Sequence, residues 1–170
     1  MARRVAIGIQ DFGKLLKHNC FYVDKTLFIK EWWENMDDVT LITRPRRFGK
    51  TLTMSMLEQF FSVNYAQEKA VFEKLNIWEY EEYRGLQGTY PVIFLSFSRV
   101  KGNSYPYTRM MMNQILTEMY GRNRYLLDGD LLSEAEKKYF HEVCDTMQEH
   151  TAVAAIHRLS EFLYRFYKKK

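Results

Sequence analysis

The sequence has 170 residues, the size of one ordinary domain with a buried core. Apolar residues make up 46% of it and aromatic residues 16%, which excludes an intrinsically disordered chain. The net charge of +4 is modest, and two cysteines, Cys20 and Cys144, are too few for a disulfide framework, which indicates a reducing cytoplasm. No apolar run approaches the roughly 18 residues of a membrane span, and the apolar stretch after Arg4 is too short for a signal peptide. We therefore expect a cytoplasmic protein with no membrane partner.

Residues 1–38 form an N-terminal segment with weak patterning. Residues 5–7 and 21–23 are short extended candidates on either side of a helical turn over residues 12–18. Asp24 can cap a following helix, whose tryptophans we expect in the core rather than against a ligand. The apolar residues at helical spacing in that helix are Phe28, Ile29, Trp32, Trp33 and Met36.

Residues 39–61 predict a strand, a loop and a helix in succession. Residues 39–43 are mostly apolar or β-branched, as in a buried strand. The next eight residues, RPRRFGKT, end in Gly49, Lys50 and Thr51, the G-K-[ST] end of a phosphate-binding loop, whereas Arg44 stands where that motif has its first glycine. Either Arg44 adopts a costly backbone conformation or the loop opens differently. The apolar residues that follow on one helical face are Leu52, Met56, Leu57, Phe60 and Phe61.

The chemistry of such a loop assigns a role to each residue. Backbone N–H groups from Arg47 to Thr51 would cradle a β-phosphate. Lys50, the catalytic residue that we expect, would bridge the β- and γ-phosphates, and the Thr51 hydroxyl would ligate Mg²⁺. Arg46 or Arg47 would either neutralise the γ-phosphate or remain an exposed arginine. The expected nucleotide-binding residues are Arg46, Arg47, Phe48, Gly49, Lys50, Thr51 and Leu52, and the expected cofactors are ATP and Mg²⁺.

Aromatic residues near the loop carry weaker predictions. We expect Phe48 to pack beneath the loop rather than to touch a ligand. Phe12 and Tyr22 are candidates to stack on an adenine base, against the simpler alternative that both are core residues. Asp24 and Lys25 need no ligand, because a helix cap and a surface charge explain them.

Residues 90–98 contain the second predicted strand. Its run of apolar residues is nearly continuous, which favours burial on both faces of a parallel sheet. Residues 62–90 are helical or irregular up to this strand, and Gly85 and Gly88 mark a turn.

Residues 104–168 predict three helices. The first has several methionines, including Met111, Met112 and Met119, which we interpret as core filler rather than as an adaptable binding groove. The second begins with a capping box formed by Ser133 and Glu136. The third carries a wide apolar stripe that must pack on another element.

Together these elements predict an α/β protein, a P-loop NTPase with a three-layer α/β/α arrangement and a partly parallel sheet. The predicted domain is rich in helices and lacks the strand that would carry an acidic residue. Phosphate-binding-loop enzymes need an acidic residue that holds Mg²⁺ and positions the attacking water. No apolar run in this sequence ends in Asp or Glu, so we expect a domain that stops before that strand.

Four motifs in order resemble the AAA-ATPase-like family of bacterial and archaeal proteins. They are IGIQDF at residues 7–12, YVDKT at 22–26, RPRRFGKT at 44–51 and YPVIFLS at 90–96. The family's own loop has arginine in place of the first glycine. The resemblance implies a single, incomplete ATP-binding domain over residues 1–170. It also implies that full-length members continue with an acidic Walker B strand and often with a restriction-endonuclease-like nuclease domain.

Three functions follow as hypotheses. The first is binding of ATP and Mg²⁺ by this chain, with hydrolysis requiring the absent acidic strand. The second is a non-enzymatic nucleic-acid-binding module that uses the arginines of the loop and the lysines at 168–170. The third is an assembly piece that pairs with another copy of itself. In the intact protein, the absent C-terminal domain would supply a further contact with nucleic acid.

Overall fold

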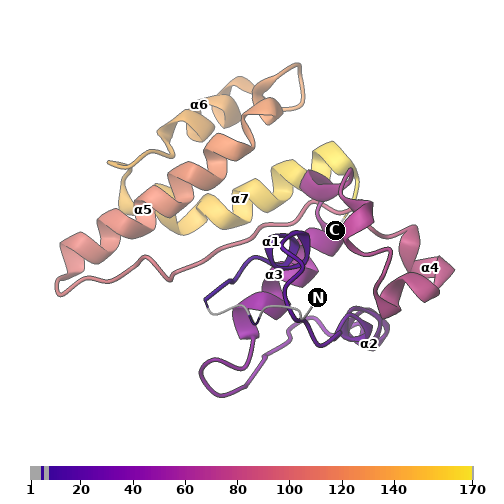
Figure 1. Ribbon diagram of the computed structural model, residues 1–170. Coiled ribbons are helices and arrows are strands. Elements are labelled where there is room, and N and C mark those ends of the chain that lie inside the picture. The colour runs from indigo at the N-terminus through magenta and orange to yellow at the C-terminus, as the bar shows by residue number, and fades with distance from the viewer. Residues whose placement is uncertain (1–4, 6–7, 170) are drawn as a thin grey trace. The chain divides into compact units, whose positions relative to one another are not determined.

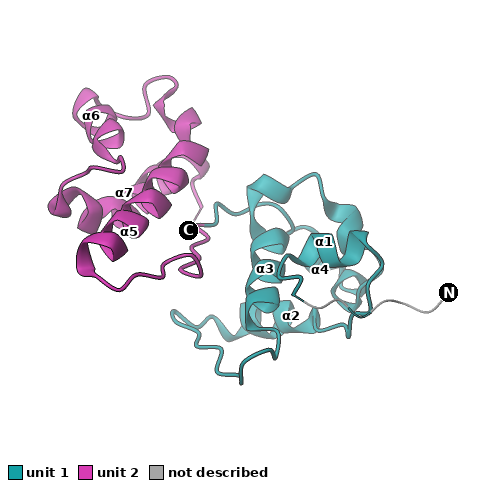
Figure 2. Cartoon of the chain, turned by 60° about the vertical axis from the view of Figure 1, so that its left-hand side comes forward, with its two compact units in different colours: residues 1–92 teal, residues 93–170 magenta. Residues whose placement is uncertain are grey.

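The computed structural model describes residue 5 and residues 8–169, and the chain divides into two compact units, residues 1–92 and residues 93–170 (Figure 2). Unit 1 contains α1 (Phe12–Lys17), α2 (Leu27–Asn35), α3 (Lys50–Phe61), the 3-10 turns η1 (Val63–Tyr65), η2 (Lys69–Val71) and η3 (Asn76–Glu79), and α4 (Glu81–Arg84). Unit 2 contains α5 (Tyr105–Arg122), η4 (Arg124–Leu127), α6 (Glu134–Glu142) and α7 (Glu149–Tyr167) (Figure 1).

The core of unit 1 is built around α3 and is largely aromatic. Phe60 is fully buried and packs edge-on against Phe61 and Phe72, with ring centroids 5.1 Å apart in both pairs. Trp32 and Trp33 are half-buried and pack on Phe61, each with ring centroids 5.4 Å from it, so the tryptophans of α2 face the core as predicted. The predicted helix over Phe28–Met36 is confirmed as α2, except that Met36 lies just past its end and is 86% exposed.

Buried polar side chains tie the short helices of unit 1 to α3. Ser55 Oγ accepts a hydrogen bond from the Phe12 backbone N–H at 3.1 Å, which attaches the first residue of α1 to α3. Gln59 Nε2 donates to Ser55 Oγ and to Asp11 Oδ2 at 3.2 and 3.1 Å. Asp11 is itself the N-cap of α1 and accepts from the Lys14 N–H. The predicted helical turn at 12–18 is thus confirmed as α1.

The end of α3 is joined to residues 88–90 by backbone hydrogen bonds. Gly88 N–H donates to Phe60 O, and Tyr90 N–H donates to Phe61 O, each at 2.8 Å. Gly88 has a φ of +70°, and a Cβ at this position would lie 2.4 Å from Ala66 Cα. Glycine is therefore required here both for its conformation and for its lack of a side chain.

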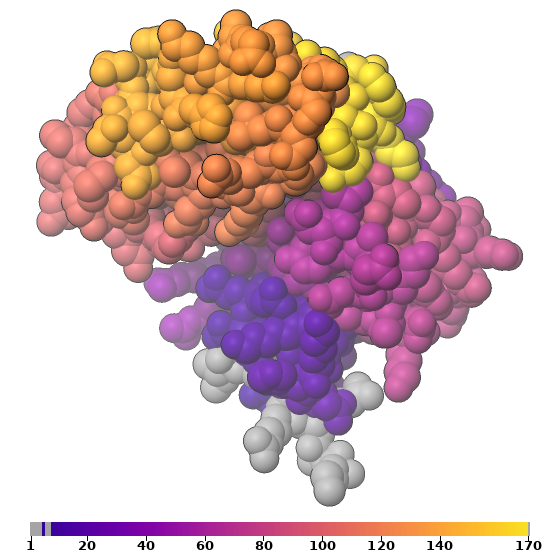
Figure 3. Space-filling model, turned by 90° about the horizontal axis from the view of Figure 1, so that it is seen from above, coloured from indigo at the N-terminus to yellow at the C-terminus, as the bar shows by residue number. Residues whose placement is uncertain are grey.

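Unit 2 is a helical body in which α5 and α7 lie side by side (Figure 1). Tyr120 on α5 is 2% exposed, and its hydroxyl donates to Ala155 O on α7 at 2.8 Å. The predicted capping box is present, because Ser133 Oγ accepts from Glu136 N–H and the Glu136 carboxylate accepts from Ser133 N–H. Residues of α5 and α6 make up a continuous outer surface of this unit (Figure 3).

The expected three-layer α/β/α fold with a partly parallel sheet is wrong for the described residues, which form no strand. Residues 39–43 lack regular structure, and Val39 and Leu41 are 87% and 82% exposed. Residues 91–95 are half-buried and 96–98 are exposed, so burial on both faces is wrong as well. An isolated parallel bridge joins Ser62 and Tyr90. The physical reason is that a strand needs a partner for its N–H and C=O groups. Apart from the bonds of Tyr90 with Phe61 and Val63, no described backbone hydrogen bond joins either segment to a distant part of the chain.

Some predicted features lie outside the described residues. These are the extended segment at residues 5–7, of which Val5 alone is described, and Lys170 in the terminal lysine run.

Candidate functional site

The loop over residues 44–49 turns sharply before α3. The Phe48 N–H donates to Pro45 O at 3.3 Å. Arg47 and Gly49 have φ values of +72° and +77°, both in the left-handed region. A Cβ at Gly49 would meet nothing within 4 Å, so glycine is needed there for its conformation and not for room. The loop therefore opens differently from the glycine-first motif, with the unusual backbone at Arg47 and not at Arg44.

The beginning of α3 presents free backbone N–H groups. Gly49 is the N-cap, no side chain caps the helix, and its first turn has no acidic residue. The first helical hydrogen bond runs from Thr53 N–H to Gly49 O at 2.8 Å. The N–H groups of Lys50, Thr51 and Leu52 thus lack a helical acceptor. Such an end attracts an anion, because the helix dipole and the free N–H groups both favour negative charge.

Lys50 folds back over the loop, and its Nζ donates to Arg44 O. The side chain is exposed, as are those of Arg46 and Arg47, and none of these cations forms an ion pair with a described residue. Thr51 is exposed and its hydroxyl has no hydrogen bond within the described part of the chain, whereas Leu52 packs against the core. The loop therefore carries several positive charges next to backbone N–H groups that have no hydrogen-bond acceptor.

Phe48 does not pack beneath the loop. It is 62% exposed, so this prediction is wrong, and an exposed aromatic side chain stands in sequence between Arg46, Arg47 and Lys50. Residue type alone predicts an apolar residue in the interior, whereas a turn rich in arginine offers Phe48 no apolar surface to cover it.

The two aromatic residues that were candidates for stacking on a base pack in the core of unit 1 instead. Phe12 is fully buried, stacked on Phe72 at 5.5 Å and met edge-on by Tyr22 at 5.4 Å. The Tyr22 hydroxyl accepts from Lys25 N–H at 3.1 Å, and burial raises the pKa of Tyr22 to about 12. Both residues therefore act in packing in this structure.

Asp24 and Thr26 form a brace that sequence reasoning did not foresee. Asp24 accepts hydrogen bonds from Thr26 N–H and Oγ1 and, at 2.7 Å, from the distant Asn76 N–H. Thr26 Oγ1 in turn accepts from Ile77 N–H at 3.1 Å. Thr26, not Asp24, is the N-cap residue of α2. The YVDKT motif therefore positions η3 beside α2, a long-range role that no local spacing reveals.

Two hollows lie away from the loop. One of about 340 Å³, in unit 1, lies between α1 and the end of α3 and is lined by Asp11, Gly13, Lys14, Lys17, His18, Gln59, Tyr65 and Glu68. One of about 320 Å³, in unit 2, lies beside the start of α5. The sequence signal that could have located the second is a row of Tyr105, Arg109 and Asn113, four residues apart, on one face of α5.

The described residues contain no group of three or more His, Cys, Asp or Glu side chains placed to hold a metal ion. Nor does any helix in the described part of the chain combine the length and apolar character needed to cross a bilayer.

Comparison with known proteins places the chain in context. The sequence model of a family described as "Predicted AAA-ATPase" matches residues 6–168. An uncharacterized protein from the vnfD 5′ region of Azotobacter chroococcum mcd 1 is 32% identical over 99 residues, which cover 56% of this chain. The match covers 17% of that curated relative's length. No solved structure matches the chain.

Proposed function

Because the chain belongs to the AAA-ATPase-like family, we propose that it binds ATP and Mg²⁺ at the loop of residues 44–51. ATPase activity is the general role that this family implies. The assignment of ATP and Mg²⁺ binding to particular residues of this chain is our proposal.

The observation that carries the proposal is the uncapped start of α3. Three backbone N–H groups without a helical acceptor and an exposed lysine lie at this helix start, three arginines precede it in the loop, and the first turn has no acidic residue. A cation at the first helical position is unfavourable next to the positive end of the helix dipole. A bound polyphosphate removes that conflict, because it accepts from the N–H groups and neutralises Lys50 at once.

The donor set suits a nucleoside triphosphate with its metal. The N–H groups of Lys50, Thr51 and Leu52 would hold phosphate oxygens, and the Lys50 ammonium would leave Arg44 O for the β- and γ-phosphates. Thr51 would ligate Mg²⁺ with its free hydroxyl, and Arg46 and Arg47 would add positive potential. Gly49 keeps the loop backbone close to the ligand. We expect binding without turnover by this chain, because hydrolysis also needs an acidic residue that positions water.

Titration of a fluorescent ATP analogue with Mg²⁺ tests the proposal. Lys50→Ala should weaken binding about 10- to 150-fold, the equivalent of the roughly 1.5–3 kcal/mol of a hydrogen bond to a charged group. Lys74→Ala is the matched control, since Lys74 is an exposed lysine of the same unit outside the loop. Thr51→Val should remove most of the Mg²⁺ dependence. Equal affinity of the wild type and the Lys50 variant would contradict the proposal.

A second candidate function is supported by the exposure of Phe48. An aromatic ring in solvent among basic side chains is the arrangement on which single-stranded nucleic acids stack. On this alternative the loop binds an oligonucleotide without chemistry, and affinity falls steeply with salt.

Phe48→Ala separates the two candidates. It should weaken binding of a single-stranded oligonucleotide about tenfold if the ring stacks on a base, and leave the affinity for the ATP analogue nearly unchanged. An oligonucleotide affinity that does not respond to this change would exclude the second candidate.

A further inference from the structure

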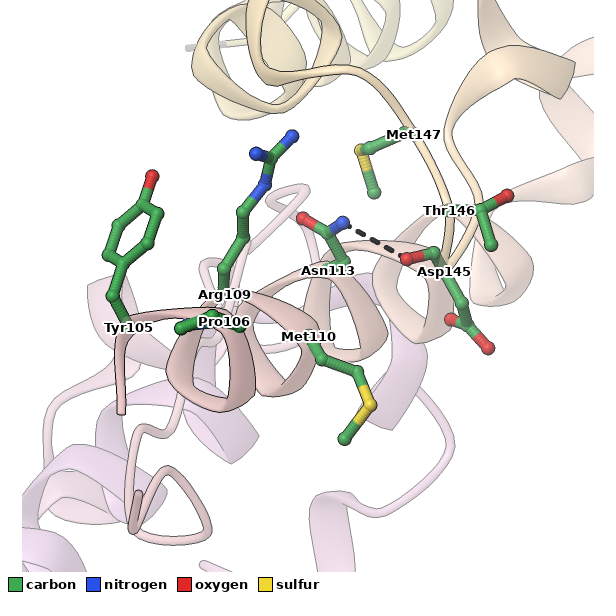
Figure 4. A pocket seen from close by; sticks show the side chains of 8 residues that line it. All are labelled: Tyr105, Pro106, Arg109, Met110, Asn113, Asp145, Thr146 and Met147. Atoms are coloured by element: carbon green, nitrogen blue, oxygen red, sulfur yellow. Dashed lines mark hydrogen bonds between the residues drawn. The ribbon is translucent and has the colours of Figure 1, made fainter. Parts of the chain in front are cut away.

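The hollow beside the start of α5 has a composition that its packing role does not explain. It is lined by Tyr105, Pro106, Arg109, Met110, Asn113, Asp145, Thr146 and Met147 (Figure 4). All eight belong to unit 2, and its volume is about 320 Å³. We call it the α5 hollow.

Three polar residues form a row along the helix in this hollow. Tyr105, Arg109 and Asn113 are spaced four residues apart, so their side chains leave the same face of α5. Figure 4 shows the Arg109 guanidinium and the Asn113 amide directed to the side of α5 on which Met147 lies. A ligand running along the helix would meet these groups in order.

Asn113 is a fixed hydrogen-bond acceptor in the hollow. It is 5% exposed, and its Nδ2 donates to Asp145 O at 3.0 Å, which sets the orientation of the amide. The other end of the amide, Oδ1, accepts no hydrogen bond from any described residue. This oxygen retains access to solvent in the described structure, so it can receive an N–H group from outside the chain.

The Arg109 guanidinium forms only a weak ion pair within the described part of the chain. Its ion pair in the described structure is with Glu149, at 4.0 Å, and the Glu149 side chain is 71% exposed. Such a long, solvated pair contributes little. The guanidinium is therefore available to a carboxylate of a partner.

The apolar part of the hollow is provided by methionines. Met110 is 41% exposed at the rim, and Met147 is buried behind it. Met119, by contrast, is 7% exposed in the core, so the prediction that the methionines of this helix are core filler is confirmed for Met119 and wrong for Met112, which is 38% exposed. Methionine adapts its shape to a partner, and Met, Tyr and Arg are the residues enriched at the centres of protein interfaces.

We propose that the α5 hollow binds an extended peptide segment of a partner protein in which an acidic residue neighbours an aliphatic one. The acidic side chain pairs with Arg109, a backbone N–H donates to Asn113 Oδ1, and the aliphatic side chain packs on Met110 and Met147. A peptide fits better than a small metabolite, because Tyr105, 67% exposed, and Met110 leave one side open, whereas small-molecule pockets enclose most of their ligand. This proposal is independent of nucleotide binding by the loop.

Fluorescence anisotropy with the full chain tests this inference. The probes are short labelled peptides in which one Asp neighbours Leu, Ile, Val or Met, together with the same peptides carrying Asn in place of Asp. We expect the Asp peptides to bind, and Arg109→Gln to weaken them about tenfold. Arg122→Gln is the matched control, because Arg122 is an exposed arginine of the same helix outside the hollow.

The methionines provide a second matched pair. Met110 and Met112 lie on one helix with similar exposures of 41% and 38%, and Met110 alone lines the hollow. Met110→Ala should weaken the Asp peptides about fivefold through lost apolar contact, and Met112→Ala should not. The proposal is overturned if no peptide of the panel changes its anisotropy, if both members of each pair behave alike, or if a single-stranded oligonucleotide binds the hollow in place of the peptides.

Discussion

Each of the two units is stabilised internally in its own way. Unit 1 has helices of 6, 9, 12 and 4 residues, whereas α5 and α7 of unit 2 have 18 and 19. Helices shorter than about 12 residues are marginal without tertiary support. Unit 1 supplies that support with hydrogen bonds between residues far apart in sequence, such as Phe12 to Ser55 and Asn76 to Asp24.

Unit 2 combines local signals with hydrogen bonds between distant residues, such as Tyr120 to Ala155 and Asn113 to Asp145. Its long helices α5 and α7 contribute buried apolar residues to one core, with a regular apolar face on α7, and α6 begins with a capping box within four consecutive residues. The comparison teaches that the motif-rich half of the sequence uses several of its polar motif residues for architecture, so that a motif residue in unit 1 is not automatically a ligand contact.

The aromatic core of unit 1 gives the largest expected effect. Phe60→Ala removes a fully buried ring that packs on Phe61 and Phe72 and should cost about 3–5 kcal/mol. Hydrogen exchange should then show lost protection in residues 12–90, with residues 105–167 still protected. Phe166→Ala, at a 45% exposed position of α7, is the control and should have a small effect. Uniform loss of hydrogen-exchange protection over both units would contradict the view that each unit is stabilised by its own core.

The Asp24 brace gives an intermediate effect. Asp24→Ala leaves the backbone N–H groups of Thr26 and Asn76 without their acceptor and should destabilise unit 1 by roughly 2 kcal/mol, measured by denaturant unfolding. Asp38→Ala changes an exposed carboxylate with no described interaction and serves as the control. If the two variants unfold at the same denaturant concentration, the motif does not have the structural role assigned above.

The smallest effect is expected at Glu136 in unit 2, and it depends on pH. Arg165, at 2.7 Å, and then the Ser133 N–H lower the pKa of Glu136 below its ordinary 4.5. Because the folded state favours the ionised form, this stability is present above that value and is lost as the pH falls through the lowered pKa.

Glu136→Gln tests this dependence because glutamine can still complete a capping box. The variant should be less stable by about 0.5–1 kcal/mol near neutral pH, and the melting temperatures of the two proteins should converge in acid. A difference that persists unchanged at low pH would show that the carboxylate charge is not the cause.

The sequence predicted the helices well because their signals are local. The apolar spacing of α2, α3, α5 and α7 and the Ser133–Glu136 box can be read within a few residues, and each element is present. The sheet was wrong because apolar, β-branched runs at 39–43 and 90–98 indicate only that a segment can extend. Which backbone would pair with it depends on distant residues, and the described part of the chain leaves Val39 and Leu41 in solvent.

The candidate site was located only in part. Gly49 and Lys50 were expected at the start of a helix, and α3 begins there, while their ligand roles stay predictions. Two features could not be predicted: the exposure of Phe48, and an Asn113 Oδ1 that accepts no hydrogen bond from a described residue. Both depend on how neighbouring segments pack and not on residue type.

Two helix ends in this protein suggest a route to engineered thermal tolerance. Met36 and Lys168 end α2 and α7 with φ values of +49° and +55°. Side chains with a Cβ resist this conformation, and glycine adopts it freely. Glycine at either position should therefore raise the midpoint of heat denaturation, by an amount equivalent to about 0.5–1 kcal/mol, without touching the loop or the α5 hollow.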